Sequence, residues 1–377
     1  MTFLKGMDIS DLAEIEKHGG VYFDRGIKKD AVKIFAEHGI NLARIRIWND
    51  PYDENGNPYG GGTSDVKTFL SLAKRAKECG MGVLADFHYS DFWADPGKQT
   101  MPKAWRSFPY EELKKALYEF TKETLELCVK EDVIPEYVAV GNEVTNGLCW
   151  PVGKVPAFDR IAGLISAGIR AVRETVPSAK VMIHLDNGGN KKLYENWFRE
   201  YFENGGEDFD AIGLSYYPLW HGSPEDLEEN LRFLSGTYGK ELIIAETSYP
   251  FTLQDYAEYE TYMSGKRKGM AIKPELLENC TEPFSPEGQC SFLGKLARIV
   301  VDNPCGKGII WWGGALIPRE GSSWGNDNAI EYAHEKGPGG NEWANQAVFD
   351  FDGNALPVLD RLGRIVDSCE KCDKVKT

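Results

Sequence analysis

Several features common in other protein classes are scarce or missing in this chain. Cysteine is sparse, with eight residues scattered over 377 positions, which is too few for a disulfide scaffold. Basic residues are outnumbered, 43 Lys and Arg against 58 Asp and Glu, so the formal net charge is −15. That charge argues against a surface that binds nucleic acid or anionic lipid. No run approaches the roughly 18 apolar residues of a membrane span. The sequence therefore predicts neither a nucleic-acid nor a membrane partner.

Motifs for nucleotides, export and metals are also missing or weak. Neither G-x-G-x-x-G after the first expected strand nor G-x-x-x-x-G-K-[ST] is present. The N-terminus lacks a basic segment followed by an apolar one, which favours a cytoplasmic protein, or a secreted one whose signal peptide has been removed. A lone C-x-x-C, Cys369 to Cys372, is a weak zinc or redox signal. Cys280 and Cys290 could pair in an oxidising compartment or remain free thiols. We expect no cofactor and no metal.

What the chain does have is a regular alternation of strands and helices. Apolar residues make up 42% of the chain and charged residues 27%, enough to bury a sizeable core. Eight apolar segments read as strands, with helical periodicity between them, at residues 3–8, 40–47, 81–88, 137–141, 180–185, 209–215, 242–245 and 308–312. That number predicts an α/β fold, a single (β/α)8 TIM barrel over residues 1–377 with extended βα loops. An open doubly wound sheet is the alternative, and we expect a monomer.

Two helix starts carry capping residues. Ser64 is expected to cap a helix whose apolar face begins at Val66. Ser223 precedes Pro224 and two acidic residues, a typical N-cap followed by proline in the first turn.

Polar and aromatic residues follow the expected strands. In a barrel of this kind, the carboxyl ends of the strands carry the functional groups. The residues at these ends are Asp8, Arg44, Arg46, Trp48, Asp86, His88, Asn142, Glu143, His184, Asp186, Tyr216, Tyr217, Glu246, Trp311 and Trp312. Their convergence on one face predicts a polar catalytic pocket.

Glu143 and Glu246 are the strongest catalytic candidates. Each follows an apolar run, so each carboxylate should be partly desolvated, with a raised pKa or a cation partner. Arg44 and Arg46 point the same way on their strand, and either could keep Glu246 ionised. Two carboxylates of opposite protonation are what hydrolysis of a glycosidic bond needs. A buried ion pair without chemistry is the alternative.

Several longer segments carry a family resemblance. They are residues 44–52 (RIRIWNDPY), 86–98 (DFHYSDFWADPGK), 140–147 (VGNEVTNG), 214–222 (LSYYPLWHG), 245–250 (AETSYP) and 345–356 (NQAVFDFDGNAL). Together they resemble glycoside hydrolase family 53, the endo-β-1,4-galactanases (arabinogalactan endo-β-1,4-galactanases) of a retaining clan built on (β/α)8 barrels. The resemblance implies a glycosidase that cleaves β-1,4-galactan, a pectin side chain, internally and with retention.

The resemblance also implies roles for individual residues. Glu143 would be the acid/base and Glu246 the nucleophile. Asn142 would hydrogen-bond the sugar 2-hydroxyl, whereas Arg46 and Tyr217 would hydrogen-bond the nucleophile. The remaining candidates would bind the sugar chain. His88 and Trp312 would line the subsite of the cleaved sugar, and the walls of the cleft would be formed by Asp91, Trp93 and Trp220.

Two departures from the family pattern affect these expectations. Bacterial relatives often carry an Asp-Gly-Asp-Gly-His-type calcium loop after the nucleophile, but residues 252–261 (TLQDYAEYET) lack its turn glycines. We therefore expect no calcium there. The Tyr-Trp-Glu-Pro-Ala-Trp segment of the family is replaced by residues 311–316 (WWGGAL), which changes the expected subsite.

Three rival functions remain at this point. A barrel that binds carbohydrate without cleaving it would tolerate loss of Glu246. A sugar-phosphate enzyme would need an anion site after the last strands, for which Gly313 and Gly314 are a faint candidate, with Arg319 as the nearest basic residue. An enzyme that processes only short galacto-oligosaccharides is the third.

Overall fold

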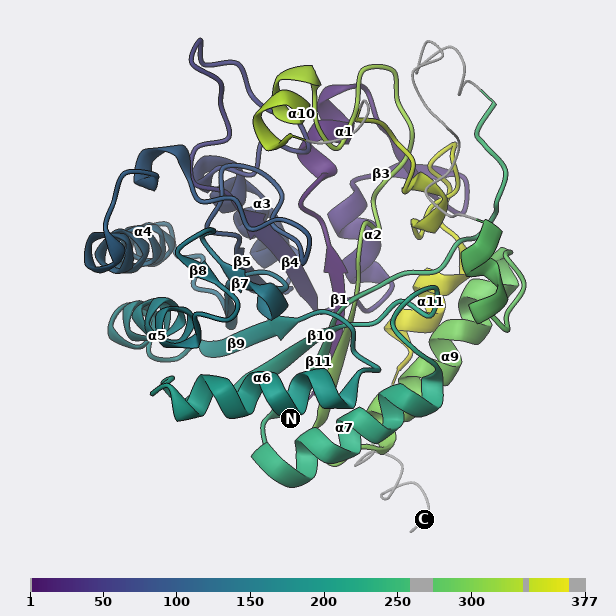
Figure 1. Ribbon diagram of the computed structural model, residues 1–377. Coiled ribbons are helices and arrows are strands. Elements are labelled where there is room, and N and C mark those ends of the chain that lie inside the picture. The colour runs from purple at the N-terminus through teal and green to yellow at the C-terminus, as the bar shows by residue number, and fades with distance from the viewer. Residues whose placement is uncertain (1, 258–273, 335–338, 366–377) are drawn as a thin grey trace.

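The computed structural model describes residues 2–257, 274–334 and 339–365. Within them, eight parallel strands close into a barrel in the order β1-β12-β11-β10-β9-β6-β5-β4 (Figure 1). The strands are β1 (Leu4–Asp8), β4 (Leu42–Ile47), β5 (Gly82–Phe87), β6 (Tyr137–Val140), β9 (Lys180–Leu185), β10 (Ala211–Ser215), β11 (Glu241–Thr247) and β12 (Gly306–Trp311). The predicted (β/α)8 barrel is confirmed, and the open sheet is excluded. That all of residues 1–377 form one domain stays a prediction.

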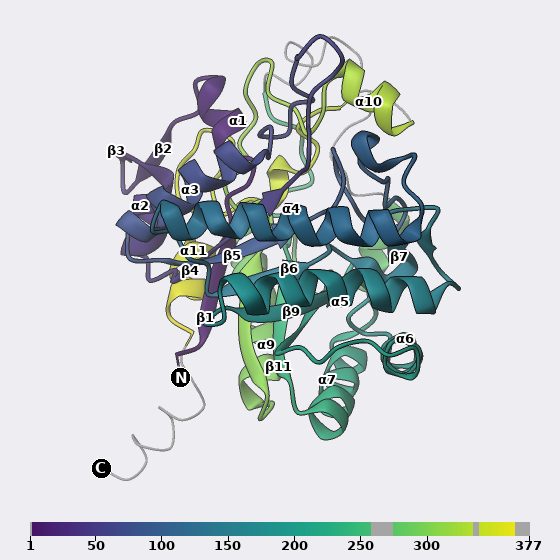
Figure 2. The ribbon, with the colours of Figure 1, turned by 90° about the vertical axis from the view of Figure 1, so that its left-hand side faces the viewer.

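A ring of helices surrounds the barrel. It comprises α2 (Ala31–Glu37), α3 (Val66–Glu78), α4 (Tyr110–Lys130), α5 (Phe158–Thr175), α6 (Lys191–Glu203), α7 (Pro224–Tyr238), α9 (Pro286–Asp302) and α11 (Pro357–Gly363). Figure 2 shows α4 and α5 running side by side along the outside of the strands. Their apolar faces and the outward strand residues form the main core, because both surfaces lose water on contact.

The inside of the barrel has an apolar floor and a polar top. Its floor is formed by strand residues such as Leu84, Met182, Ile243 and Ile310. Towards the carboxyl ends of the strands the buried side chains become charged or polar, beginning with Arg44 and Asp86. A packed floor keeps the barrel closed at one end, so any ligand must enter from the other.

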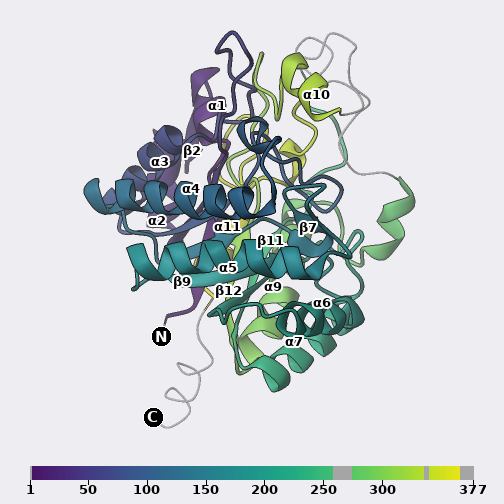
Figure 3. The same ribbon diagram turned by 60° about the vertical axis from the view of Figure 1, so that its left-hand side comes forward.

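The βα loops build the open end. They carry α1 (Leu12–Lys17), α10 (Asp327–Ala333), the hairpins β2 (Tyr22–Asp24) with β3 (Ile27–Lys29) and β7 (Gly147–Leu148) with β8 (Gly153–Lys154), and the 3-10 turns Lys103–Trp105, Val144–Asn146, Pro274–Asn279 and Ala344–Gln346. Figure 3 shows α1 and α10 together at this end, opposite the N-terminus. A cluster of Trp48, Tyr59, Phe92 and Ala329 joins the loops after β4 and β5 to α10.

The capping expectations have different outcomes. Ser223 caps α7 with a full capping box, its hydroxyl accepting from the Asp226 backbone N–H. The expectation for Ser64 is wrong, since Asp65 caps α3 by accepting from the Thr68 N–H at 2.7 Å. The Ser64 hydroxyl accepts from Arg46 Nε instead.

The described cysteines are free thiols, Cys280 and Cys290 among them. Cys369 and Cys372 lie outside the described residues. No helix in the described ranges is both long enough and apolar enough to cross a membrane.

Candidate active site

The barrel opens into a cleft of about 610 Å³ at the carboxyl ends of its strands. Its lining residues are Arg44, Arg46, His88, Trp93, Ala94, Asp95, Pro96, Lys98, Asn142, Glu143, Asp186, Asn187, Tyr217, Trp220, His221, Glu246, Trp312, Trp324 and Trp343. Besides the two glutamates, eight residues were predicted to line the cleft, and seven of them do (Arg46, His88, Trp93, Asn142, Tyr217, Trp220 and Trp312). Glu143, Glu246, Arg44 and Asp186 line it as well, so convergence is confirmed for these strand-end residues. It is wrong for Tyr216 and Trp311, which pack in the main core.

Glu246 reaches the cleft through an irregularity in β11. Ile243 and Ala245 face the inside of the barrel, so strict alternation would turn Glu246 outward. Instead the pairing shifts by one residue: Leu214 pairs with Ile244, but Ser215 pairs with Glu246. A bulge of this kind redirects a side chain near a functional site. It places the carboxylate inside, over the apolar floor.

Glu143 follows β6 in an unusual backbone conformation. Its φ is 46°, in the left-handed region that residues with a Cβ rarely adopt, and it precedes the turn Val144–Asn146. Residues held in this way concentrate at functional sites. The turn directs the carboxylate back over the barrel mouth.

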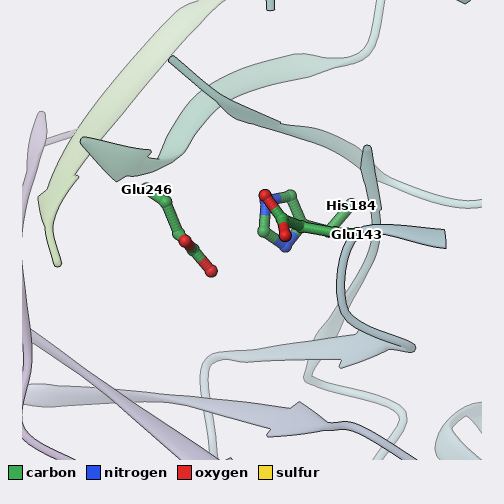
Figure 4. A group of neighbouring side chains, drawn as sticks. All are labelled: Glu143, His184 and Glu246. Atoms are coloured by element: carbon green, nitrogen blue, oxygen red, sulfur yellow. The ribbon is translucent and has the colours of Figure 1, made fainter. Parts of the chain in front are cut away.

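The two carboxylates face one another. Figure 4 shows Glu246 on one side of the gap and Glu143, with His184, on the other. A carboxylate oxygen of each glutamate and a ring nitrogen of His184 lie within 4.8 Å of one another. Such a trio could ligate a metal, but Arg44 already donates to Glu246, and both His184 nitrogens lie 2.9 Å from protein oxygens. The donor set fits proton transfer better than cation binding.

Arg44 is the cation that contacts Glu246. Its guanidinium donates to Glu246 Oε1 at 2.7 Å and also to Asp8, Asp86 and Asn142, at 2.6 to 2.8 Å. Tyr217 donates its hydroxyl to Glu246 Oε2 at 3.0 Å. Both oxygens of Glu246 therefore accept a hydrogen bond, which orients the carboxylate and favours its charged form.

The two glutamates differ in electrostatics. Burial raises the pKa of Glu246 to about 7, even though Arg44 pulls in the opposite direction. Burial, then the charges of Glu246 and Asp186, raise the pKa of Glu143 well above its usual range. Such a pair titrates as a unit, with Glu143 keeping its proton to higher pH than Glu246.

The expectation that Arg46 hydrogen-bonds Glu246 is wrong. Arg46 donates to Asp11 Oδ1 at 2.7 Å, to Ser64 and to the Gly61 carbonyl. Its guanidinium lies 3.7 Å from the centre of the Trp93 ring, a cation–π contact that supports the indole from behind. Arg46 therefore acts on the wall of the cleft and Arg44 on the nucleophile candidate.

Asp91 is also misplaced by the sequence prediction, because it does not line the cleft. It is fully buried and accepts from the backbone N–H groups of Asp50 and Lys103 and from the Tyr332 hydroxyl. These bonds tie the loops after β4 and β5 to α10. Asp91 thus fixes loops and is not positioned to touch a ligand.

Asn142 and His88 line the cleft with most of their polar atoms already used. Asn142 Oδ1 accepts from Arg44, and Asn142 Nδ2 donates to the Ala94 carbonyl, which leaves one amide hydrogen for a ligand. His88 Nδ1 faces two donors, the Ala94 N–H and Trp48 Nε1, so Nε2 carries the proton toward Asp86. Both residues are therefore fixed in orientation before a ligand arrives.

Aromatic rings form one wall of the cleft. Trp312 packs edge-on against Trp343, with ring centres 5.8 Å apart, and also contacts Trp93. Trp220 stacks on Tyr217 with centres 5.1 Å apart and keeps 36% of its surface exposed. Flat indole faces suit the apolar face of a sugar ring. Trp324 and Trp343 were not predicted, because they come from the irregular loop after β12, where no periodicity marks an inward residue.

Known proteins resemble this chain over most of its length. The profile described as Glycosyl hydrolase family 53 matches residues 4–362. The endo-beta-1,4-galactanase of Bacillus subtilis (strain 168) is 37% identical over 95% of this chain and 84% of its own length. The arabinogalactan endo-beta-1,4-galactanase of Cellvibrio japonicus (strain Ueda107) is 35% identical over 95% and 89%. The solved GH53 catalytic domain of Ignisphaera aggregans superposes with a TM-score of 0.87, at 38% identity, over 97% of this chain and 96% of that one.

Proposed function

The chain belongs to glycosyl hydrolase family 53, and from this premise we propose that it cleaves β-1,4-galactosidic bonds inside galactan or arabinogalactan chains, with retention. The main support for the proposal is that Glu143 and Glu246 face one another, with a carboxylate oxygen of one within 4.8 Å of a carboxylate oxygen of the other. Retaining enzymes place the two carboxyl groups roughly 5–5.5 Å apart, whereas inverting enzymes need roughly 6.5–9.5 Å to admit a water.

Glu143 is assigned as the acid/base and Glu246 as the nucleophile. Glu143 has the higher pKa, so it carries the proton that the leaving oxygen needs. Glu246, aligned by Arg44 and Tyr217, attacks the anomeric carbon and forms a galactosyl ester. Glu143 then removes a proton from the water that hydrolyses this ester. Asn142, His88 and the tryptophans of the cleft are proposed to bind the sugar chain.

The rival readings fit the structure less well. Arg319 donates to the carbonyls of Pro318 and Phe351, so it is not aimed at a phosphate. A Cβ on Gly314 would lie 1.9 Å from Met7 Sδ, which explains that glycine by packing alone. A binder without activity would not need two desolvated carboxylates, whose burial is costly.

A polysaccharide panel tests the proposed substrate. Purified β-1,4-galactan, arabinogalactan, mannan, xylan and glucan are incubated with the protein, and product lengths are followed. We expect early release of mixed oligomers from the two galactans, with the β-anomer formed first by NMR. Intact galactan with cleavage of short oligomers alone would favour the oligosaccharide processor, and an α-anomer first would exclude retention.

The pH dependence should show the two glutamates. We expect kcat/KM to rise with pH through about 7, where Glu246 ionises, and to fall at higher pH as Glu143 loses its proton. Tyr217→Phe removes a donor to the charged form of Glu246, so its pKa should rise and the acidic limb should move up by about one pH unit.

Rates measured across the pH range on galactan check this expectation. Tyr249→Phe is the control, since that buried hydroxyl donates to the Glu282 carbonyl away from the cleft. If the acidic limb of the kcat/KM profile of Tyr217→Phe stays in place or moves to lower pH, the assigned hydrogen bond is contradicted.

We propose a cytoplasmic location, in which the described cysteines would remain reduced. Recovery of the native protein only from the culture medium would contradict it. A monomer stays a prediction, to be checked by light scattering.

A further inference from the structure

A chain of polar side chains connects Glu143 through Ser215 and His184 to Asn142. Glu143 Oε1 lies 2.5 Å from Ser215 Oγ, and Ser215 Oγ lies 2.9 Å from His184 Nε2. His184 Nδ1 in turn lies 2.9 Å from Asn142 Oδ1. Ser215 and His184 are completely buried, so these contacts are not shared with bulk water. The direction in which each hydrogen bond runs therefore depends on the protein alone.

Asn142 determines the direction of its hydrogen bond with His184, at the end of the chain opposite Glu143. Its Oδ1 accepts from Arg44, which can only donate, and its Nδ2 donates to the Ala94 carbonyl, which can only accept. The amide cannot be turned over without losing both bonds. Asn142 Oδ1 must therefore accept from His184 as well, so His184 Nδ1 carries a hydrogen.

The protonation of His184 determines the direction of its hydrogen bond with Ser215. Burial, and then the charge of Arg44, lower the pKa of His184 to about 3, so the ring is neutral. A neutral imidazole with a hydrogen on Nδ1 has a bare Nε2, which can only accept. The single hydroxyl hydrogen of Ser215 satisfies it. Ser215 Oγ then has lone pairs, but no hydrogen, to offer Glu143.

We propose that Asn142, His184 and Ser215 form a one-way hydrogen-bond chain that holds the proton on Glu143 in the resting enzyme. Glu143 donates its carboxyl O–H to Ser215, Ser215 donates to His184, and His184 donates to Asn142. Ser215 and His184 are thus positioning residues, since they act through Glu143. The inference rests on the proposed function for its meaning in catalysis, but the protonation it assigns belongs to the free protein.

The chain also has a second state. When Glu143 gives its proton to the leaving oxygen, it becomes an acceptor, and the Ser215 hydroxyl can rotate to donate to it. His184 Nε2 is then left buried without a donor, which is unfavourable. When Glu143 takes a proton from the attacking water, the first arrangement returns. The chain therefore favours reprotonation at the end of each cycle.

Other charges near Glu143 act in every variant alike. Glu246 on β11 and Asp186 after β9 face it, with Asp95 beyond, and each raises its pKa. Arg44 donates hydrogen bonds to Asn142 and Glu246, and Tyr217 lies in the same cleft as Glu143. None of these groups is changed below.

His184→Leu tests the direction of the chain. It removes the acceptor that holds the Ser215 hydrogen, so Ser215 becomes free to donate to ionised Glu143, and the pKa of Glu143 should fall by about one pH unit. If Ser215 instead donates to a Glu143 carboxylate in the resting protein, with His184 donating to Ser215, the substitution should raise that pKa. The sign of the shift decides between the two arrangements. Ser166→Ala is the control, since this buried serine lies on α5, away from the cleft, and accepts from the Glu207 N–H.

The titration is read by 13C NMR on protein labelled at the glutamate carboxyl carbons, with the Glu143 signal assigned by its loss in Glu143→Gln. No substrate is needed, so the result stands whether or not galactan is cleaved. The basic limb of kcat/KM should move to lower pH in parallel. A raised pKa in His184→Leu, or a Glu143 signal in the unaltered protein that titrates below that of Glu246, would overturn the proposal.

Discussion

Glu246→Ala should reduce kcat on galactan by at least about 10⁴-fold while leaving the affinity for the polysaccharide nearly unchanged. The substitution removes the atom that attacks the anomeric carbon, but it leaves the tryptophan wall of the cleft in place. Folding should survive, because Arg44 keeps its ion pairs with Asp8 and Asp86. The substitution therefore slows the chemical step and does not weaken binding of the polysaccharide.

A small anion should restore part of this activity. With an activated galactoside, azide can enter the space that the carboxylate leaves and attack from the same side. The product would be the α-galactosyl azide, identified by NMR. Glu241→Gln is the control, since Glu241 lies at the other end of β11 and accepts from Tyr137 and Lys180. Full activity in Glu246→Ala would favour the binding barrel, and a β-azide would show that Glu246 is not the nucleophile.

The fold could be predicted from the sequence because its signal is local. Each strand is a short apolar run, and each is followed by a helix with one apolar face, so the order of elements alone indicates the barrel. The same argument placed Glu143 and Glu246 at strand ends, without any knowledge of their distance. Resemblance to family 53 then added roles that the pattern of residues does not contain.

The choice between Arg44 and Arg46 could not be made from the sequence. Both point into the barrel, and they are two residues apart, about 6–7 Å along the strand. This separation determines the carboxylate that each one contacts. Arg44 forms an ion pair with Glu246, whereas Arg46 lies nearer the loops and forms an ion pair with Asp11. The partner depends on the loop of α1, whose position no local pattern encodes.

The bulge in β11 was also invisible in the sequence. Period-two alternation would send Glu246 outward, and only the pairing of Ser215 with Glu246 shows that one extra residue is accommodated.

Asp91 illustrates the reverse error. A carboxylate in an aromatic loop near the cleft looked available, but three donors from separate segments enclose it.

Glu143→Gln should give a loss that depends on the leaving group. On galactan the departing sugar needs a proton, so we expect kcat to fall by roughly 10²–10⁴-fold. On a dinitrophenyl galactoside the departing phenolate needs none, so the galactosyl ester on Glu246 should still form rapidly. The ester would then accumulate, because no base activates water, and a burst of phenolate followed by slow turnover should be seen.

Azide separates this variant from the nucleophile variant. It needs no general base, so it should attack the accumulated ester and speed turnover of the dinitrophenyl substrate. Since the ester has already inverted the anomeric carbon once, the second attack should give the β-galactosyl azide, opposite to the product expected from Glu246→Ala. The two anomers, measured by NMR on the same substrate, assign the two glutamates independently of their pKa values. Equal losses on both substrates, or an α-azide from Glu143→Gln, would contradict the role given to Glu143.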